Sequence, residues 1–372
     1  MKNKGMKILF LTNIPSPYRV DFFNELGKTC DLTVLFENKN ARSRDANWIA
    51  DKITDFKSVF MKGIRVGDAE AICPSVIKYL SRERFDIIVI GYYSTPTAMI
   101  AIEYMRLKKI PFVISSDGGM KKDDCKIKYS LKKHFISAAS SWLSTGHTTS
   151  EYLKYYGAKK EKIFFYPFTS IKKKDVINEI LTSEDKKYYK KQLKMQEDKI
   201  VLSVGSYTYR KGYDILLKSC ATLDKNIGIY IVGGEATEEY LKLQKEFDLT
   251  NVHFIGFKKK DQLVDYYKAA DVFILPTRGD VWGLVINEAM AYGLPIITTD
   301  QCVAGIEMIR TSGKIVPVNS NWGAIIQDFL SNDNLQYMSN ESLKCACKYT
   351  IEEMAIAHMN IFKRILQVEA TE

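Results

Sequence analysis

Two carboxylates in the second half of the chain are the residues whose type and spacing best suit binding chemistry. Asp280 stands just before a segment expected to be helical at 284–292, and Glu288 lies inside that segment. An acid before a helix ordinarily caps it, which is the simplest interpretation of Asp280. Glu288 has apolar neighbours nearly all round the helix, so its carboxylate needs a hydrogen-bond donor or a ligand. A ribose diol would provide two hydroxyl donors.

Basic residues earlier in the same half could bind an anion. Gly205 ends an expected strand at 200–204, and Arg210 and Lys211 stand at the entrance of a helix expected at 212–221. A glycine permits a tight turn, and a helix N-terminus offers free N–H groups and the positive end of its dipole. Basic residues at helix starts are also common on protein surfaces, so this element does not by itself define a phosphate site.

A pair of glycines, Gly233 and Gly234, follows another expected strand at 227–232. Glycines at the carboxyl end of a strand let a ligand approach the backbone closely. A plain turn explains the pair equally well.

The elements that must position these residues alternate between strand and helix along the whole chain. Short Ile-, Val- and Leu-rich runs separated by amphipathic stretches indicate parallel sheets covered on both faces. In the first half, strands are expected at 7–12, 32–36, 86–90, 111–115, 141–144 and 163–166, and helices at 17–27, 75–84, 96–108 and 124–137.

The second half repeats the pattern after a polar, lysine-rich segment at 170–198, which we interpret as a linker with an exposed helix. Strands are expected at 200–204, 227–232, 252–255, 272–275, 295–299 and 314–317, and helices at 212–221, 238–247, 260–270 and 284–292. The fold class is therefore α/β, with two Rossmann-like parallel-sheet lobes at 1–169 and 170–349 and a cleft between the carboxyl ends of their sheets. A last helix at 350–372 is expected to pack back on the first lobe.

Bulk composition limits the class of protein. The 372 residues are 46% hydrophobic and 26% charged, which suits two globular domains. No apolar run is long enough to span a membrane, and no signal peptide is recognisable, so a cytoplasmic location is expected. Seven scattered cysteines without a CxxC pair indicate reduced thiols. The net charge of +10 suggests an anionic partner: nucleic acid, an anionic membrane surface or a phosphorylated substrate.

The segment around the two acids resembles the E-x7-E region of the large retaining glycosyltransferase family with the GT-B fold, called group 1 or family 4. Here the pattern reads Asp280-x7-Glu288, so the first acid is Asp. The resemblance extends over nearly the whole chain, through the opening loop at 13–19, the Arg-Lys-Gly element ending at Gly212 and the segment at 251–257.

The resemblance implies roles for the residues that match the family pattern. Glu288 would bind the donor ribose, Lys211 the diphosphate, and Asp280 the transferred sugar. The amides of Gly283 and Leu284 would help to hold the phosphates.

Four further residues belong to the same expected donor site. The strand end at Phe257 would face the nucleobase. Many relatives carry Arg directly after the glycine of the first element, where this chain has Ser206. Arg210 is expected to supply the second positive charge in its place, with Gly205 and Gly234 lining the site.

The implied reaction is transfer with retention and without a metal or other cofactor. No Asp-x-Asp stands at a strand end; Asp123-Asp124 lies in a lysine-rich segment. Two cations and a helix dipole would stabilise the charge on the departing diphosphate. Relatives often have a His near the cleft in the first lobe, and Asp117 occupies the comparable strand end here. Asp117 is either a turn residue or a group that orients or deprotonates the acceptor.

The expected function is transfer of a hexosyl or N-acetylhexosaminyl group from a nucleotide-diphosphate sugar, with UDP favoured, to a glycan or lipid-linked acceptor in cell-surface polysaccharide biosynthesis. The alternative is a non-catalytic GT-B protein that binds anionic partners. A nicotinamide-dependent oxidoreductase is disfavoured because no G-x-G-x-x-G follows the first strand. No nucleic-acid-binding motif is present.

One helix of the first lobe could contact a membrane. The segment at 124–137 mixes Lys126, Lys128, Lys132 and Lys133 with apolar residues. Such a helix either rests on an anionic leaflet at the inner face of the plasma membrane or simply covers the sheet.

Overall fold

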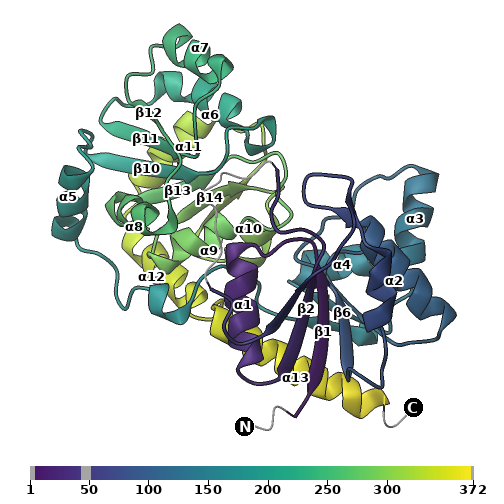
Figure 1. Cartoon of the computed structure of the whole chain (residues 1–372). Coiled ribbons are helices and arrows are strands. Elements are labelled where there is room, and N and C mark those ends of the chain that lie inside the picture. The colour runs from purple at the N-terminus through teal and green to yellow at the C-terminus, as the bar shows by residue number, and fades with distance from the viewer. Residues whose placement is uncertain (1–4, 43–51, 370–372) are drawn as a thin grey trace. The chain divides into compact units, whose positions relative to one another are not determined.

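The computed structural model describes residues 5–42 and 52–369 (Figure 1). Contacts divide the chain into two compact units, Met1–Ser170 with Thr350–Glu372 (unit 1) and Ile171–Tyr349 (unit 2). These limits differ from the expected lobe boundaries by one residue at most. Each unit contains its own parallel sheet covered by helices, which confirms the expected class of two Rossmann-like α/β lobes.

Unit 1 is built on a seven-stranded parallel sheet in the order β3-β2-β1-β6-β7-β8-β9. The strand order reverses beside β1, because β2 and β3 lie on one side of it and the later strands on the other. The strands are β1 (Lys7–Thr12), β2 (Asp31–Phe36), β3 (Lys57–Phe60), β6 (Ile87–Ile90), β7 (Val113–Ser115), β8 (Ser141–Ser144) and β9 (Ile163–Phe165).

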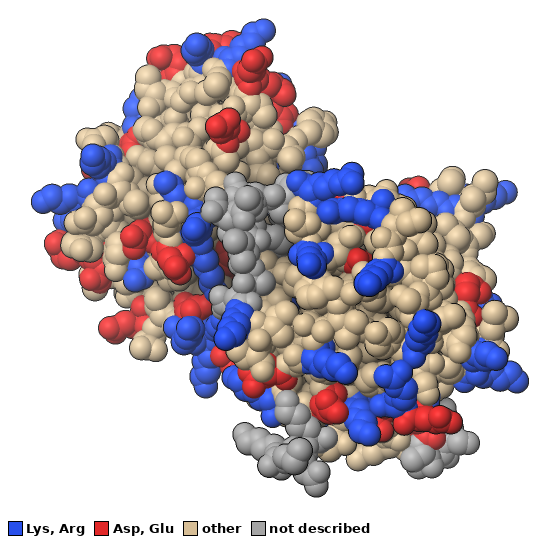
Figure 2. Space-filling model, viewed as in Figure 1, with Lys and Arg blue, Asp and Glu red and all other residues tan. Residues whose placement is uncertain are grey.

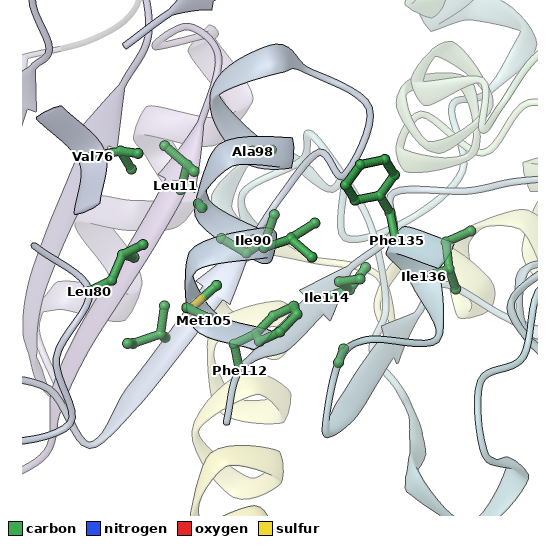
Figure 3. Close-up of a cluster of buried hydrophobic side chains, with 14 of the residues drawn as sticks. Leu11, Val76, Leu80, Ile90, Ala98, Met105, Phe112, Ile114, Phe135 and Ile136 are labelled. Carbon is green, nitrogen blue, oxygen red and sulfur yellow. The ribbon is translucent and has the colours of Figure 1, made fainter. Parts of the chain in front are cut away.

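Helices of unit 1 bury the apolar side chains of this sheet. One core cluster joins Ile90 and Ile114 of the sheet to Ala98 and Met105 of α2 (Figure 3). The terminal helix α13 packs on α1 within the same unit. The helices are α1 (Pro17–Gly27), α2 (Pro96–Leu107), α3 (Lys126–Ile136), α4 (His147–Tyr155) and α13 (Ile351–Glu369).

Three parts of unit 1 differ from the sequence expectation, the first of which is α4, a helix that was not expected. The helix expected at 75–84 is a short 3-10 helix, Pro74–Tyr79, because the chain leaves helical geometry at Leu80 and buries that side chain. The edge strand β3 and a small hairpin of β4 (Ile64–Arg65) and β5 (Ala71–Ile72) were not expected. These strands are short and partly exposed, so they lack the apolar run by which the central strands are recognised.

Unit 2 contains a six-stranded sheet in the order β12-β11-β10-β13-β14-β15. All six expected strands are present, as β10 (Lys199–Val204), β11 (Ile227–Val232), β12 (Val252–Ile255), β13 (Val272–Leu275), β14 (Ile296–Thr299) and β15 (Gly313–Val316). Here the order reverses between β10 and β13. Ligands of open parallel sheets bind outside the carboxyl ends of the strands at such a point.

The helices of unit 2 include all those expected and three more. The expected ones are α5 (Ser183–Gln192), α6 (Tyr213–Ser219), α7 (Glu238–Glu246), α8 (Lys260–Ala269) and α9 (Leu284–Ala291). The additional helices are α10 (Val303–Met308), α11 (Trp322–Leu330) and α12 (Leu335–Ala346). The α5 helix lies in the segment at 170–198 that the sequence analysis interpreted as a linker. It begins with a capping box between Thr182 and Asp185.

A buried carboxyl group lies beyond the end of β2 in unit 1. Glu37 is 3% exposed; Thr95 Oγ1 donates to its Oε1 at 2.5 Å, and the Ala71 amide donates to its Oε2 at 3.0 Å. Desolvation raises the pKa of Glu37 to about 7, although both hydrogen bonds act in the opposite direction. The group therefore keeps its proton in the folded protein at pH values where it would lose it in the unfolded chain.

We expect Glu37→Gln to remove a pH dependence of stability. As pH rises from about 4.3 to about 7, the unfolded chain releases a proton that the folded chain retains, so the wild type loses about 2–3 kcal/mol of unfolding free energy relative to the variant. Urea unfolding at pH 5 and pH 8 measures this difference, with the exposed Glu83→Gln as control. Parallel pH profiles of wild type and Glu37→Gln would contradict it.

Candidate active site

Loops after β10 and β13 meet where the sheet of unit 2 reverses its strand order. The loop after β10 runs from Gly205 into a 3-10 turn, Tyr209–Lys211, before α6. The loop after β13 continues to α9. The two loops bond directly, because the amide of Arg278 donates to the carbonyl of Arg210 at 2.8 Å and Thr277 Oγ1 donates to the same carbonyl at 3.0 Å.

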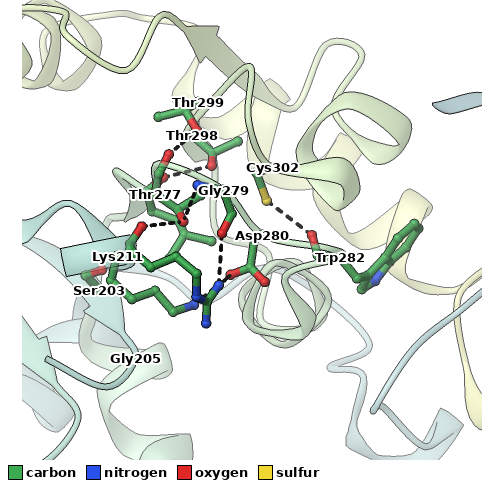
Figure 4. A network of polar contacts seen from close by, with 12 residues as sticks. Ser203, Gly205, Lys211, Thr277, Gly279, Asp280, Trp282, Thr298, Thr299 and Cys302 are labelled. Carbon is green, nitrogen blue, oxygen red and sulfur yellow. Dashed lines mark hydrogen bonds and ion pairs between the residues drawn. The ribbon is translucent and has the colours of Figure 1, made fainter. Parts of the chain in front are cut away.

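The Asp280 carboxylate is shared by two cations at this point. Lys211 Nζ lies 2.7 Å and Arg210 Nη1 3.2 Å from Asp280 Oδ2, and Arg210 also donates to the Gly279 carbonyl at 3.0 Å. Figure 4 shows Lys211 extending along the site to Asp280. Lys211 is buried, at 7% exposed, whereas the Arg210 side chain is 53% exposed. The structure thus brings together three of the predicted residues, with one more positive than negative charge.

Hydroxyl groups hold the strand ends that carry the site. Ser203 Oγ donates to the Ile274 carbonyl at 2.8 Å. Thr298 and Thr299 Oγ1 donate to the carbonyls of Leu275 and Thr277 at 2.8 and 2.6 Å (Figure 4). Since these hydroxyls are buried, they satisfy strand-end carbonyls that would otherwise lose hydrogen bonds to water.

Arg278 is a residue of this region that the sequence analysis missed. Its guanidinium binds the Asp214 carboxylate through two hydrogen bonds of 2.7 and 2.6 Å and lies 3.8 Å from the centre of the Tyr209 ring. This bidentate pair fixes the turn that carries Arg210 and Lys211. Arg278 stands two positions before Asp280 in the sequence. This proximity to the predicted acid was the one available indication that Arg278 belongs to the site.

Asp280 does not cap α9. The N-cap position is Gly283, without a side-chain cap, and Asp280 instead forms a β-bridge with Cys302. Its amide donates to the Gln301 carbonyl at 2.9 Å. The simplest sequence interpretation of this acid was therefore wrong, because the chain turns away from helical geometry between Asp280 and Gly283.

Glu288 lies on α9 and is half-buried. Tyr267 Oη donates to Glu288 Oε2 at 2.9 Å, and Tyr267 stacks on Tyr292 with their ring centres 5.4 Å apart. The buried face of α9 is formed by other residues, including Asn287, whose Oδ1 accepts from Trp282 Nε1 at 2.8 Å. Glu288 is thus not one of the fully buried residues of this helix, in contrast to the sequence expectation of a largely buried carboxylate.

The glycines and Phe257 occupy strand ends of the same sheet. Gly205 lies against the Lys211 side chain, since a Cβ there would stand 3.1 Å from Lys211 Cε. Gly234 has a φ of 128° and free space at its Cβ position. Phe257 follows β12 at the sheet edge and is 38% exposed. Leu284, partly exposed, begins α9 after Gly283.

Asp117 belongs to unit 1, where it follows β7. Its Oδ2 accepts a hydrogen bond from Arg19 Nη2, and its Oδ1 accepts one from Tyr166 Oη at 3.0 Å. The sequence analysis missed Arg19. Helical spacing could have found it, because Arg19 lies on the same face of α1 as buried Phe22, Phe23 and Leu26.

The structure also bears on metal binding and on membrane-spanning helices. Among residues 5–42 and 52–369, no three His, Cys, Asp or Glu side chains are grouped to hold a metal ion. Asp124 pairs with Lys132 at 2.7 Å and Lys128 at 3.2 Å. Within the same residues, no helix combines the length and hydrophobicity that crossing a membrane requires.

Comparison with known proteins places this site in a family. Residues 184–343 match the family model of glycosyl transferases group 1. An uncharacterised glycosyltransferase of Methanocaldococcus jannaschii is 25% identical over 78% of this chain and 78% of its own length. The matched residues include Arg210, Lys211, Asp280 and Glu288, so the part of the chain that carries the site is similar to the group 1 glycosyltransferases, as its resemblance implied.

Further comparisons concern a relative that matches part of the chain and a solved structure with the same fold. Lipopolysaccharide glucosyltransferase WaaG of Escherichia coli is 26% identical over 42% of this chain and 43% of its own length. The structure of Anabaena HepE in complex with UDP and glucose superposes with a TM-score of 0.73 at 15% identity, over 99% of this chain and 100% of that chain. At that identity the likeness establishes the fold, which is the expected GT-B fold.

We expect Gly283→Ala to disrupt the start of α9. Gly283 has a φ of 105°, and a Cβ would stand 2.8 Å from Cys302 Sγ. Strain and crowding should together cost about 2 kcal/mol of unfolding free energy or more. Gly279→Ala is the matched control, because a Cβ at Gly279 meets no atom within 4 Å. Equal denaturant stability of the two variants would refute this account of the turn.

Proposed function

We propose that this chain transfers a hexosyl or N-acetylhexosaminyl group from a UDP-sugar, with retention of configuration, to a glycan or lipid-linked acceptor of a cell-surface polysaccharide. The match of residues 184–343 to the family model of glycosyl transferases group 1 supports the reaction class. The observation that carries the proposal is the pairing of Lys211 and Arg210 with Asp280 at the strand-order reversal of unit 2.

The charges of this group suit a sugar diphosphate. Lys211 and Arg210 share one carboxylate, so an incoming diphosphate would find one uncompensated positive charge and two cations that can turn toward it. Once the phosphates engage these cations, Asp280 becomes available to accept hydrogen bonds from hydroxyls of the transferred sugar. Gly234 leaves the backbone open at an adjoining strand end, and Gly205 makes room for the Lys211 side chain.

The transfer step breaks the bond between sugar C1 and the β-phosphate oxygen and forms a bond from C1 to the acceptor oxygen on the same face. The acceptor proton passes to the departing phosphate oxygen, so the reaction needs no separate strong base. Lys211 and Arg210 would stabilise the negative charge that grows on the diphosphate, as would the amides of Gly283 and Leu284. This proposal assigns the charge stabilisation to side chains and amides, and requires no metal.

Glu288 would bind the ribose of the donor. Tyr267 donates a hydrogen bond to its Oε2, and a carboxylate can accept several hydrogen bonds, which suits it to bind ribose hydroxyls. The aromatic ring of Phe257, at the end of β12, would stack against the nucleobase. Uridine is favoured because HepE, which shares the fold, binds UDP together with glucose.

The acceptor class follows from the relatives. WaaG is a lipopolysaccharide glucosyltransferase, so a saccharide destined for the cell surface is the acceptor we propose. The non-catalytic alternative is disfavoured, because the acid and both cations that transfer needs are present together. A nucleic-acid partner is also disfavoured, since Figure 2 shows Lys and Arg interspersed with Asp and Glu on the face in view.

We expect Lys211→Met and Glu288→Gln to lower kcat/KM at least 100-fold, because each removes a charged contact to the donor. The assay is UDP release from UDP-glucose, UDP-galactose and their N-acetylhexosamine counterparts, with water as acceptor. Glu288→Gln should also abolish the UDP-induced rise in melting temperature. Lys225→Met and Glu246→Gln, both exposed, are the matched controls. Failure of the wild type to bind or hydrolyse any sugar nucleotide would refute the proposed function.

The helix α3 presents a mixed basic and apolar surface. Ile127 is 83% and Leu131 49% exposed, one helical turn apart. Lys132 is turned inward to Asp124, so it does not contribute to this surface, whereas Lys126 is exposed. Exposed isoleucine and leucine beside lysine suit the headgroup region of an anionic membrane, and we propose peripheral contact of α3 with the inner face of the plasma membrane.

We expect the double variant Lys126→Glu/Ile127→Ser to bind vesicles containing phosphatidylglycerol about tenfold more weakly than the wild type, because it loses a cation and an apolar contact. Vesicle sedimentation at low salt measures the partition. Lys187→Glu on α5, where the side chain is 71% exposed, is the control for a change of net charge alone. An equal loss of vesicle binding in the α3 variant and in Lys187→Glu would show that α3 does not contact the membrane specifically.

A further inference from the structure

We propose that Arg19 is a positioning residue, which together with Tyr166 holds the Asp117 carboxylate to receive the hydroxyl group of the acceptor. This inference rests on the proposed transferase function and adds two residues to it. Arg19 comes from α1, Asp117 from the end of β7 and Tyr166 from the end of β9, so three separate elements converge on one carboxylate.

Arg19 is unusually placed for a guanidinium. It is 1% exposed, and its Cζ lies 5.7 and 5.8 Å from the ring centres of Tyr18 and Phe168. Burial by itself lowers the pKa of Arg19 and is the largest single effect, but Asp117, together with the nearby tyrosines Tyr18, Tyr92 and Tyr166, makes the net shift upward. The buried cation therefore depends on Asp117 for its stability.

Asp117 is held from two sides and remains accessible. Arg19 binds its Oδ2 and Tyr166 its Oδ1, and the Tyr166 hydroxyl also lies 3.2 Å from the Ser116 carbonyl. The Asp117 side chain is 13% exposed, in contrast to the enclosed Arg19. A carboxylate has about four lone-pair sites, so the two bound donors leave capacity for a ligand hydroxyl.

The groups that surround the Arg19–Asp117 pair are neutral, so Arg19 balances the charge of Asp117. Desolvation and the charge of Asp117 raise the pKa of Tyr166, so its phenol is neutral. His358 of α13 packs on Tyr166 with ring centres 4.5 Å apart, and desolvation lowers its pKa to about 3, so it is neutral as well. Asp117 thus meets one cation, at a fixed place.

The pair is a poor device for stability alone. Within the part of the chain that the structure describes, Nε and Nη1 of Arg19 have no hydrogen-bond partner. Well-packed apolar residues would stabilise such a site as well or better. The carboxyl ends of parallel strands are where ligands bind, and Asp117 stands at such an end. Burying Arg19 costs free energy. The proposed role explains why the cost is tolerated, because the buried Arg19 holds the Asp117 carboxylate in place for the acceptor.

The test compares kcat and KM for UDP-sugar hydrolysis, in which water takes the place of the acceptor hydroxyl. We expect Asp117→Asn, Arg19→Met and Tyr166→Phe to lower kcat, about 10- to 100-fold for the first two and less for the third, with little change in KM for the donor. The substrate is whichever UDP-sugar of the panel the wild type hydrolyses fastest.

A double-mutant cycle separates positioning from a structural role. If Arg19 acts through Asp117, Arg19→Met lowers kcat in the wild-type background but has no further effect on Asp117→Asn. Arg19→Lys should recover part of the lost rate by restoring the charge. Rates are divided by the fraction of molecules that bind UDP, so partial unfolding does not imitate the effect. Arg82→Met, which breaks the partly buried pair with Glu369 in the same unit, should leave kcat unchanged.

The outcomes distinguish this inference from the function on which it rests. Wild-type kcat in Arg19→Met and Tyr166→Phe, with loss of activity in Lys211→Met, would overturn the positioning role and leave the transferase intact. Additive losses in the cycle would also overturn it. Should Arg19→Met fail to fold, Tyr166→Phe decides the matter, because it removes one hydroxyl and keeps the ring. An inactive wild type would instead contradict the proposed function.

Discussion

The site of unit 2 depends on a single carboxylate that neutralises two cations. Asp280 holds Lys211, which is buried, and Arg210, which is exposed, at the point where the strand order of the sheet reverses. Without an anion, two positive charges so close together would repel each other and would not be retained in a partly buried loop. Under the proposed function, the same arrangement would keep the site assembled before a phosphate binds and would let the two cations turn toward it.

The backbone around this carboxylate is arranged to keep it in place. Asp280 is tied to the loop after β14 by its bridge with Cys302, and Arg278 locks the turn after β10 through Asp214. Buried threonine and serine hydroxyls satisfy the strand-end carbonyls beneath. Loops that are fixed in this way pre-organise their side chains, which lowers the cost of binding a charged donor.

Unit 1 contains a second pair of a buried cation with a more exposed carboxylate. There the buried Arg19 pairs with Asp117 at the end of a strand. Asp117 is the more exposed of the two, and it is the residue that we propose binds the acceptor. In both units the buried member of the ion pair fixes the accessible one. Both pairs lie beyond the carboxyl ends of parallel strands, where the ends of the sheet leave room for a ligand.

The sequence alone determined the two α/β units, their central strands and the candidate residues Asp280, Lys211 and Glu288. Apolar strand runs and the spacing of the acids are local features, so they can be read without coordinates. The weakly apolar edge strand β3 and the hairpin of unit 1 could not be read in this way.

Only the tertiary structure decided which residues pair. Arg278 with Asp214, Arg19 with Asp117 and Lys211 with Asp280 are each joined across more than sixty positions of sequence, as the contacts at |i−j| of 64, 98 and 69 show. Strand order brings these partners together, and no local pattern records strand order. The physical reason is that burial and charge compensation depend on neighbours in space, whereas periodicity depends on neighbours along the chain.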